Sequence, residues 1–290
     1  MTEGKLKVSE GTIVNACKEL ANKVTPSIES IKEKLFLSEI LHKDETGIKI
    51  GGKQRWLHTL TSGNFAFYVC HEKRGKIADD YMGVLAGYWG ILMHDHLMGL
   101  YAWPCTHAEC NAHLLRYLEG IIENEPEYAV CAKEMLELIV GAHNDRKEAI
   151  VRNEKDFSDE QIKTYSECYD NILERWDKVI EIELARIGES RKKKKDRYKR
   201  EGEKLCPRLI QYKEQHLLFI KNFNVPFDNN LAERSLRGIK TKTKVSGGFR
   251  THCGGEVYAT IRSYIETLRR HKKSIHECVA LAFADAPIIF

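Results

Sequence analysis

Hydrophobic positions change their spacing along the first third of the chain. Over residues 11–36 apolar side chains recur at near-helical intervals after a cap-competent Ser9, and Pro26 interrupts the pattern, which predicts one or two helices. From residue 39 onward short runs rich in Ile, Trp, Phe, Tyr and Val are separated by GGKQ and SGN. These runs predict three successive antiparallel strands: EILHKDETGIKI, RWLHTLTSG and NFAFYVCHE.

The next pattern alternates between helix and strand. GKIADDYMGVLAG predicts a helix, YWGILMHDH predicts a buried strand that ends in polar residues, and HAECNAHLLRYLEGII returns to helical spacing. A helical crossover normally delivers the following strand parallel to the one that was left. The sequence therefore predicts an α/β fold with a mixed sheet.

From about residue 124 to 220 only helical signals remain. Two amphipathic segments cover 128–142 and 158–187, the second opened by Ser158 and Gln161 in capping-box register. After 220 we expect a helix containing NNLAER, a loop KTKTKVSGGFRTHCGG, a helix over about 255–271, and a final helix opened by Ser274 and Glu277.

Composition narrows the class of protein. A hydrophobic share of 42% and a charged share of 30% are typical of a soluble globular chain. No apolar run approaches the ~20 residues that a membrane span needs, and the N-terminus has no apolar signal region. Nine cysteines without a disulfide-like rhythm indicate reduced thiols, so we expect a cytoplasmic protein that does not associate with membranes.

The net charge of the chain is compatible with a polyanionic partner but is too small to indicate one. The formal net charge is +4, but residues 191–200 carry eight Lys or Arg against one Asp. This segment has two interpretations, a solvated helix end or loop and a patch that contacts phosphates.

Acidic residues near the ends of the predicted strands are the main candidates for chemistry. Asp44 lies near the end of the first strand and Asp95 just past the fourth. If these strands are parallel neighbours, their ends lie roughly 5 Å apart, and Glu233 could join them from a helix packed at that edge. Simpler interpretations exist: Asp44 as a turn residue before Gly47, Asp95 as the start of a loop, and Glu233 in a capping box with Asn230 at the N-cap.

Three converging carboxylates repel one another unless a cation lies among them. Oxygen ligands favour hard ions such as Mg²⁺ or Mn²⁺, and two such ions about 4 Å apart suit an in-line displacement at a phosphodiester. In this interpretation Asp44 bridges two ions, Asp95 holds one and Glu233 holds the other.

Several blocks of the chain resemble one protein family. LHKDETGIKIGGKQRWLH, HEKRGK, GILMHDH, HAECNAHLLRYL and DNNLAERSLRGIKTKTKVSGGFRT occur in the order found in the insertion sequence sixty-six family of bacterial transposases, which have a DDE active site and a ribonuclease H-like fold. The resemblance implies that Asp44, Asp95 and Glu233 are the three catalytic acids and metal ligands. It also implies an all-helical insertion between the second and third acids.

The resemblance gives the predicted domains their names. Residues 1–37 form an N-terminal helical segment, 38–123 the first part of the catalytic core, 124–220 the helical insertion, and 221–290 the C-terminal part with the glutamate-bearing helix. Longer relatives carry a DNA-binding part ahead of the catalytic one, and we expect that this chain lacks it.

Polar residues around the acids suggest further roles. Asp228 and Asn229 are expected to flank the site. A larger basic set is predicted to contact DNA phosphates, namely Arg234, Arg237, Lys240, Lys242, Lys244 and Arg250. For Arg234, pairing with a neighbouring carboxylate is an equal alternative.

A Cys-x-His and a Cys-x₂-His follow the second acid. Cys105, His107, Cys110 and His113 are residue types that bind zinc. Cys110 and His113 also resemble a structural Cys-x-x-His element of many DDE transposases, so we expect packing around a helix start and not a zinc ion.

The predicted function is metal-dependent cleavage at transposon ends and strand transfer to target DNA, by a homo-oligomer on DNA. Two alternatives remain open: a non-catalytic DNA-binding remnant of a transposase, and a metal-dependent nuclease or resolvase without strand transfer.

Overall fold

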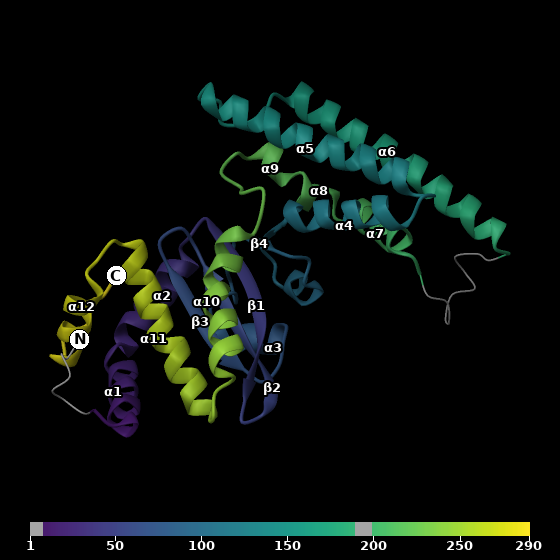
Figure 1. Ribbon diagram of the computed structural model, residues 1–290. Coiled ribbons are helices and arrows are strands. Elements are labelled where there is room, and N and C mark those ends of the chain that lie inside the picture. Colours follow the sequence, from purple (N-terminus) through teal and green to yellow (C-terminus); the bar gives the residue numbers. More distant parts are fainter. Residues whose placement is uncertain (1–7, 189–198) are drawn as a thin grey trace. The chain divides into compact units, whose positions relative to one another are not determined.

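The computed structural model of the chain describes residues 8–188 and 199–290 (Figure 1). Most of the basic segment 191–200 lies outside the described residues. The chain forms two compact units, the first made of Met1–Thr106 with Asn230–Phe290 and the second of His107–Asn229. The limits 124 and 220 of the helical insertion stay a prediction.

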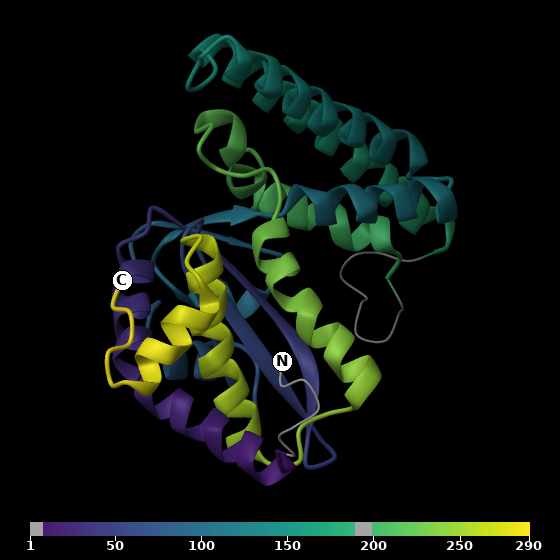
Figure 2. The same cartoon turned by 60° about the vertical axis from the view of Figure 1, so that its left-hand side comes forward.

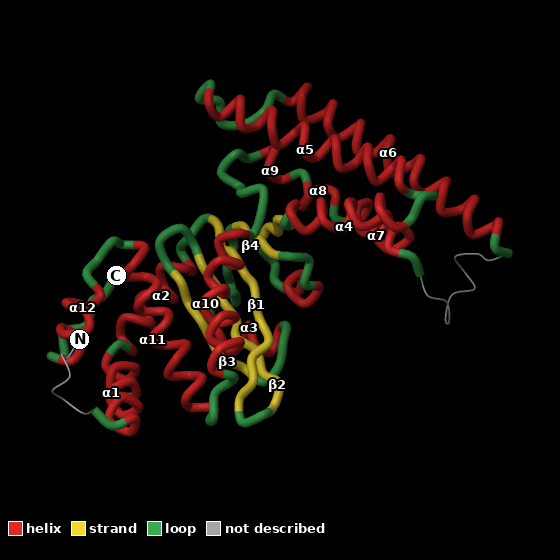
Figure 3. Tube along the Cα trace, viewed as in Figure 1, coloured by secondary structure: helices red, strands yellow, loops and turns green. Residues whose placement is uncertain are grey.

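The described residues form a five-stranded sheet in the order β3-β2-β1-β4-β5, and its first four strands along the chain belong to the first unit. Figure 3 colours the strands yellow. The strands are β1 (Ile40–Ile50), β2 (Lys53–Thr61), β3 (Ala66–His71), β4 (Ile91–His94) and β5 (Thr106–Glu109). β1 pairs antiparallel with β2 and parallel with β4, and β2 pairs antiparallel with β3. The predicted three-strand meander and the parallel crossover are therefore both confirmed.

β5 was not predicted. The helical spacing of HAECNAHLLRYL begins only at Asn111, where α4 (Asn111–Asn124) starts, and the residues before it are extended. The Thr106 N–H donates to the Gly90 carbonyl over 3.1 Å, just ahead of β4. Pairing with a neighbouring strand overrides the local helical period at this point, which is the usual way that tertiary context defeats a short pattern.

The two faces of the sheet carry separate hydrophobic clusters because side chains alternate along each strand. One face packs against α10 (Asn230–Ser246) and part of α11 (His252–Arg270); its cluster contains Ile48, Ile50, Leu57, Tyr68, Cys70, Leu236, Ile239 and Ala259. The opposite face contributes Leu41, Leu60, Phe67 and Val69 to a cluster with α1 (Glu10–Lys23), α2 (Thr25–Phe36), α3 (Lys76–Met82) and α12 (Ile275–Phe283). Figure 2 shows α1, α11 and α12 beside the sheet.

α11 covers the free edge of the sheet at β3. The Tyr68 N–H donates to the Ser263 hydroxyl over 2.9 Å, and the Ala66 N–H donates to the Thr267 hydroxyl over 3.2 Å. These bonds satisfy edge donors that would otherwise face solvent or pair with another chain.

α10 is longer than predicted and starts at a slightly different place. The N-cap is the residue just before the first helical residue, and Asn230 is already the first helical residue of α10. Asn230 is therefore not the N-cap that the capping-box interpretation requires. The helix also continues to Ser246, through the first seven residues of the predicted loop. The loop proper reaches β1, where the Phe249 N–H donates to the Lys49 carbonyl over 2.7 Å. Gly248 permits this approach, because a Cβ there would lie 2.0 Å from that carbonyl oxygen.

Helix starts follow the sequence signals elsewhere. Ser9 caps α1, Pro26 lies in the first turn of α2, and Ser274 caps α12. Ser158 and Gln161 form the expected reciprocal capping box of α6.

The second unit is helical after β5. Its helices are α4, α5 (Ala129–Val151), α6 (Asp159–Arg186), α7 (Glu201–Gln211), α8 (Lys213–His216) and α9 (Leu218–Lys221). The two long helices, α5 and α6, lie side by side, and α6 buries Tyr169, Leu173, Trp176 and Ile180 at helical spacing (Figure 1). Among the described residues, no helix has the length and apolar character required to cross a bilayer.

Candidate active site

Asp44 lies in the middle of β1, on the face that packs against α10. The sequence placed it near the end of a strand or in a turn, but β1 continues six residues further, to Ile50. Its side chain alternates onto the same face as Ile48 and Ile50, which contact Leu236 and Ile239 of α10. The carboxyl is half-buried, and its Oδ1 accepts the Glu45 N–H over 2.7 Å.

Asp95 directly follows β4, the parallel neighbour of β1. The register pairs Ile40 with Ile91 and His42 with Met93. Continuing it by two residues brings Asp95 level with Asp44, on a neighbouring strand and the same face. The next residue, His96, has a φ of 64°, a left-handed conformation that costs free energy in a non-glycine residue. Such strain is often found beside functional residues.

Glu233 comes to the same face from α10. It lies in the first turn of the helix, three residues before the buried Leu236. Leu236 and Ile239 pack with Ile48 and Ile50 in one buried cluster. This packing fixes the position of α10, and with it the position of Glu233, along β1. All three predicted acids belong to the first unit.

The pKa of Asp44 is shifted by burial and by the charges around it. Burial, above all, together with the negative charges of Asp95 and Glu233, raises this pKa from 3.8 to about 6. The hydrogen bond from the Glu45 N–H and the positive charge of Lys240 act in the opposite direction. Asp95, Glu233 and Lys240 thus all lie within electrostatic reach of Asp44.

This cluster fits a divalent cation. Its donor groups are carboxylate oxygens, the ligands that Mg²⁺ and Mn²⁺ prefer. A half-buried carboxyl that is destabilised by two like charges gains most from a bound cation, because the cation offsets both burial and repulsion. The chemistry of this donor set therefore suits such an ion.

The predicted DNA-contacting residues divide by their place on α10. Arg237, Lys240 and Lys244 follow Glu233 at intervals of four, three and four residues, so they form one stripe that starts at the acid. Arg234 is exposed on another side of the helix. The Lys242 ammonium lies 4.1 Å from the centre of the Phe249 ring, in a cation–π contact that uses it for packing.

The four Cys and His candidates differ in burial. Cys110 is buried at the start of α4, where its Sγ accepts the Asn229 N–H over 3.2 Å. His107 is buried, whereas Cys105 and His113 are half-buried. The contact of Cys110 agrees with a packing role for it at the helix start, and the expectation of no zinc stays a prediction.

The opposite face of β1 carries charged residues that sequence reasoning missed. Lys43 and Asp79 form an ion pair with a 3.3 Å Nζ–Oδ1 distance, and each side chain is only 1% exposed. The Lys43 Nζ also lies 3.1 Å from Nδ1 of His58, which is fully buried. Glu45 contacts His58 and Arg74. The signal was present in the sequence, since Lys43 and Glu45 flank Asp44 and must point away from it in a strand.

These contacts lower the pKa of Glu45, whereas the pKa of Asp44 is raised. Burial alone would raise the pKa of Glu45, but the contacts with His58 and Arg74 and the charge of Lys43 lower it to about 2. Burial lowers the pKa of His58, and the charge of Lys43 adds to this effect. The Nδ1 of His58 lies 3.1 Å from the Lys43 ammonium and 3.0 Å from the Glu45 carboxylate, and its Nε2 lies 3.1 Å from the Lys73 carbonyl.

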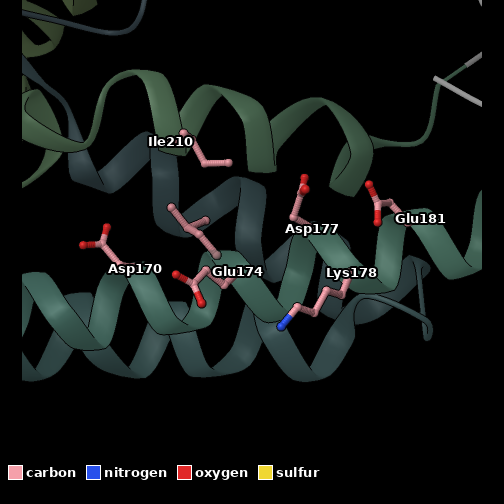
Figure 4. Close-up of a pocket in the computed structure, with 7 residues that line it drawn as sticks. Asp170, Glu174, Asp177, Lys178, Glu181 and Ile210 are labelled. Atoms are coloured by element: carbon pink, nitrogen blue, oxygen red, sulfur yellow. The ribbon is translucent and has the colours of Figure 1, made fainter. Parts of the chain in front are cut away.

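A groove in the second unit has acidic walls. Figure 4 shows Asp170, Glu174, Asp177 and Glu181 along α6, at spacings of three and four residues, with Lys178 among them and Ile210 of α7 opposite. Lys213 pairs with Asp170 over 2.6 Å. The excess of negative charge makes this groove unsuited to nucleic acid phosphates.

Comparison with known families identifies the chain. The family model described as "Transposase IS66 family" matches residues 1–257. The chain belongs to the IS66 family of transposases. A search among curated proteins gave no match.

Membership of the IS66 family assigns a transposase role in general terms. Cleavage and transesterification of DNA strands is the activity that this role suggests, and DNA is the corresponding partner. Divalent metal ions are the usual cofactors of DDE transposases, which is consistent with the donor set around Asp44.

Proposed function

We propose that this chain is the catalytic part of a DDE transposase, which cleaves transposon ends and joins their 3′-OH groups to target DNA. Asp44, Asp95 and Glu233 are the proposed catalytic acids and metal ligands. One observation carries the proposal: the parallel register of β1 and β4, continued by two residues, puts Asp95 level with Asp44, and α10, which bears Glu233, packs on the same face of β1. The raised pKa of Asp44, to about 6, agrees with this arrangement. Like charges held together on a packed sheet face cost stability, which favours a functional reason for them.

The sheet order supports a ribonuclease H-like core. An order β3-β2-β1-β4-β5 places β2 and β3 on one side of β1, and β4, its parallel neighbour, with β5 on the other, an order typical of this fold. The first two acids then come from the adjacent parallel strands β1 and β4, and the third comes from a helix packed on β1. The helical residues between Asp95 and Glu233 are the proposed insertion.

The proposed acids hold the metal ions and set their position. Asp44, Asp95 and Glu233 would hold two divalent ions, which would supply charge neutralisation at the phosphate and activation of the attacking water or 3′-OH. Asp44 is fixed by the Glu45 N–H and Glu233 by the seating of Leu236 and Ile239. The chain needs no covalent nucleophile, because positioning and electrostatics supply the catalysis.

The basic stripe on α10 is the proposed path of the DNA strand. From Glu233 to Lys244 it covers eleven residues, or about 16 Å, and Arg237, Lys240 and Lys244 succeed one another along it. Charged side chains at this spacing suit successive phosphates that leave the acids. We propose a homo-oligomer on DNA, because two transposon ends must be processed together.

The decisive experiment replaces Asp44 and follows strand cleavage. Asp44→Asn should abolish Mn²⁺-dependent nicking of a labelled transposon end, while the fold and DNA binding persist. Asp80→Asn is the matched control, since Asp80 is an exposed acid that pairs with Lys76 at the surface. Unchanged cleavage by Asp44→Asn would refute the assignment.

Product analysis separates the proposal from its alternatives. Joined products require attack by a 3′-OH and support a transposase. Nicked products without joining indicate a nuclease or resolvase. A gel shift without any cleaved product, with or without Mg²⁺, indicates a DNA-binding remnant.

A further inference from the structure

The buried charges on the far face of β1 bear on the geometry of the proposed site. Strand alternation places Lys43 and Glu45 on the face opposite to Asp44. On that face Lys43 joins β1 to α3 through Asp79 and to β2 through His58. Arg74, in the segment between β3 and α3, contacts Glu45. Side chains from α3, β2 and the segment between β3 and α3 therefore contact the two residues that flank Asp44.

A direct contact links this far face to the Asp44 carboxylate. The Glu45 N–H donates to Asp44 Oδ1 over 2.7 Å. The orientation of this N–H depends on the backbone of Glu45, and the Glu45 side chain is held by His58 and Arg74. Motion of β1 at Lys43 or Glu45 would therefore change the direction of the carboxylate.

Stability alone does not explain the ion pair. Two charges at 1% exposure lose most of their hydration, and apolar residues of similar volume often stabilise a protein equally well or better. Register provides a better explanation. A slip of β1 by one residue would turn Asp44 into the core and bring Lys43 and Glu45 to the α10 face. Paired charges that fit only one register penalise this slip strongly.

We propose that Lys43 and Asp79 are positioning residues, whose buried ion pair fixes the register of β1 and thereby aims the Asp44 carboxylate at the α10 face. This inference rests on the proposed function for the role of Asp44. It assigns to Lys43 and Asp79 no contact with DNA or with a reacting atom.

The test removes the ion pair without leaving a lone buried charge. In Lys43→Met with Asp79→Leu both charges are replaced by apolar groups of similar size, so we expect the fold to persist. The matched control is Lys76→Met with Asp80→Leu, the same residue types in an exposed pair 2.8 Å apart. Thermal unfolding checks both proteins before any other measurement.

Three readouts then distinguish positioning from general stability. In the Lys43/Asp79 double variant we expect Mn²⁺ affinity, measured by electron paramagnetic resonance with Mn²⁺ alone, to fall roughly tenfold, and kcat for cleavage to fall about 10- to 100-fold with KM for DNA unchanged. Hydrogen exchange at the Glu45 amide should accelerate. The control pair should change none of these. A folded double variant with wild-type Mn²⁺ affinity and kcat would overturn the inference.

Two further variants keep the outcomes separate. If the double variant does not fold, Asp79→Asn keeps the shape of that side chain, and wild-type Mn²⁺ affinity in it would also overturn the inference. Asp44→Asn reports on the proposed function. If Asp44→Asn loses Mn²⁺ binding while the double variant retains it, only the positioning role fails; if Asp44→Asn itself binds and cleaves as the wild type does, the proposed function fails.

Discussion

The two faces of β1 treat charge in opposite ways. On the α10 face, Asp44 has Asp95 and Glu233 as neighbours, and burial with these like charges raises its pKa to about 6. On the far face, Glu45 is surrounded by His58, Lys43 and Arg74, and they outweigh burial to bring its pKa to about 2. The far face pairs its carboxylates with positively charged side chains, and the α10 face brings like charges together.

Within one strand, the residues of the far face form ion pairs inside the protein, and the α10 face carries the proposed catalytic acid Asp44. The far face satisfies its charges with partners from α3, β2 and the segment after β3, so its task is to hold β1 in place. The α10 face holds Asp44 near two like charges, and Lys240 offsets part of their effect on Asp44. A site that binds cations needs like negative charges held close together.

The largest expected effect comes from breaking the far-face ion pair on one side only. Lys43→Met leaves Asp79 buried without its cation, and we expect the free energy of unfolding to fall by about 3–5 kcal/mol. Lys240→Met, on the exposed side of α10, should change stability little. Chemical denaturation of both variants measures the contrast. Equal losses would show that burial does not distinguish the two lysines.

A second comparison uses adjacent carboxylates with opposite pKa shifts. Because folding raises the pKa of Asp44 from 3.8 to about 6, the folded metal-free protein prefers the neutral form. The stability that this group contributes is present below pH ~4 and is lost as the pH rises through about 6. Asp44→Asn should therefore stabilise the metal-free protein at pH 8, by about 1–3 kcal/mol.

Glu45 should show the reverse. Its pKa falls from 4.5 to about 2 on folding, so its contribution is present above pH ~4.5 and is lost as the pH falls through about 2. Glu45→Gln should destabilise the protein at pH 8, by about 2–3 kcal/mol. Urea unfolding of both variants from pH 4 to pH 8 tests the pair, and the same sign of effect in both would contradict the account.

The smallest expected effects concern the basic stripe. Lys240→Gln or Lys244→Gln should each weaken binding to duplex DNA modestly and reduce the slope of log affinity against log salt concentration by about 0.9. Lys242→Gln is the control, because its ammonium lies on the Phe249 ring. Fluorescence anisotropy at several salt concentrations gives the slopes. If Lys242→Gln changed the slope of log affinity against log salt concentration more than Lys240→Gln does, the proposed DNA path along α10 would be wrong.

Sequence patterns predicted the framework well where they were long. The strand meander, the parallel pairing of β1 and β4, and the two long helices of the second unit all have clear periods, and the structure has them. Four-residue β5 carries too little pattern to outweigh the helix signal that follows it. The extra length of α10 was hidden by KTKTK, which has no apolar residue to show a period.

The candidate site was foreseen in part. Family resemblance pointed to Asp44, Asp95 and Glu233, and their assignment as catalytic acids stays a proposal. The partners of Lys43 could not be found from sequence, because Asp79 lies 36 positions away on a helix and only the packing of α3 shows that they meet. Alternation along β1 could have revealed that Lys43 and Glu45 share a face, but not what neutralises them.

The central claim is that Asp44 is held among like charges until a divalent cation binds. Carbon-13 NMR of the Asp44 side-chain carboxyl, followed through a pH titration, measures this directly. The account predicts a midpoint near pH 6 in the metal-free protein, which saturating Mg²⁺ moves down by at least one unit. A midpoint near the ordinary 3.8 without metal, or one that Mg²⁺ leaves in place, would contradict it.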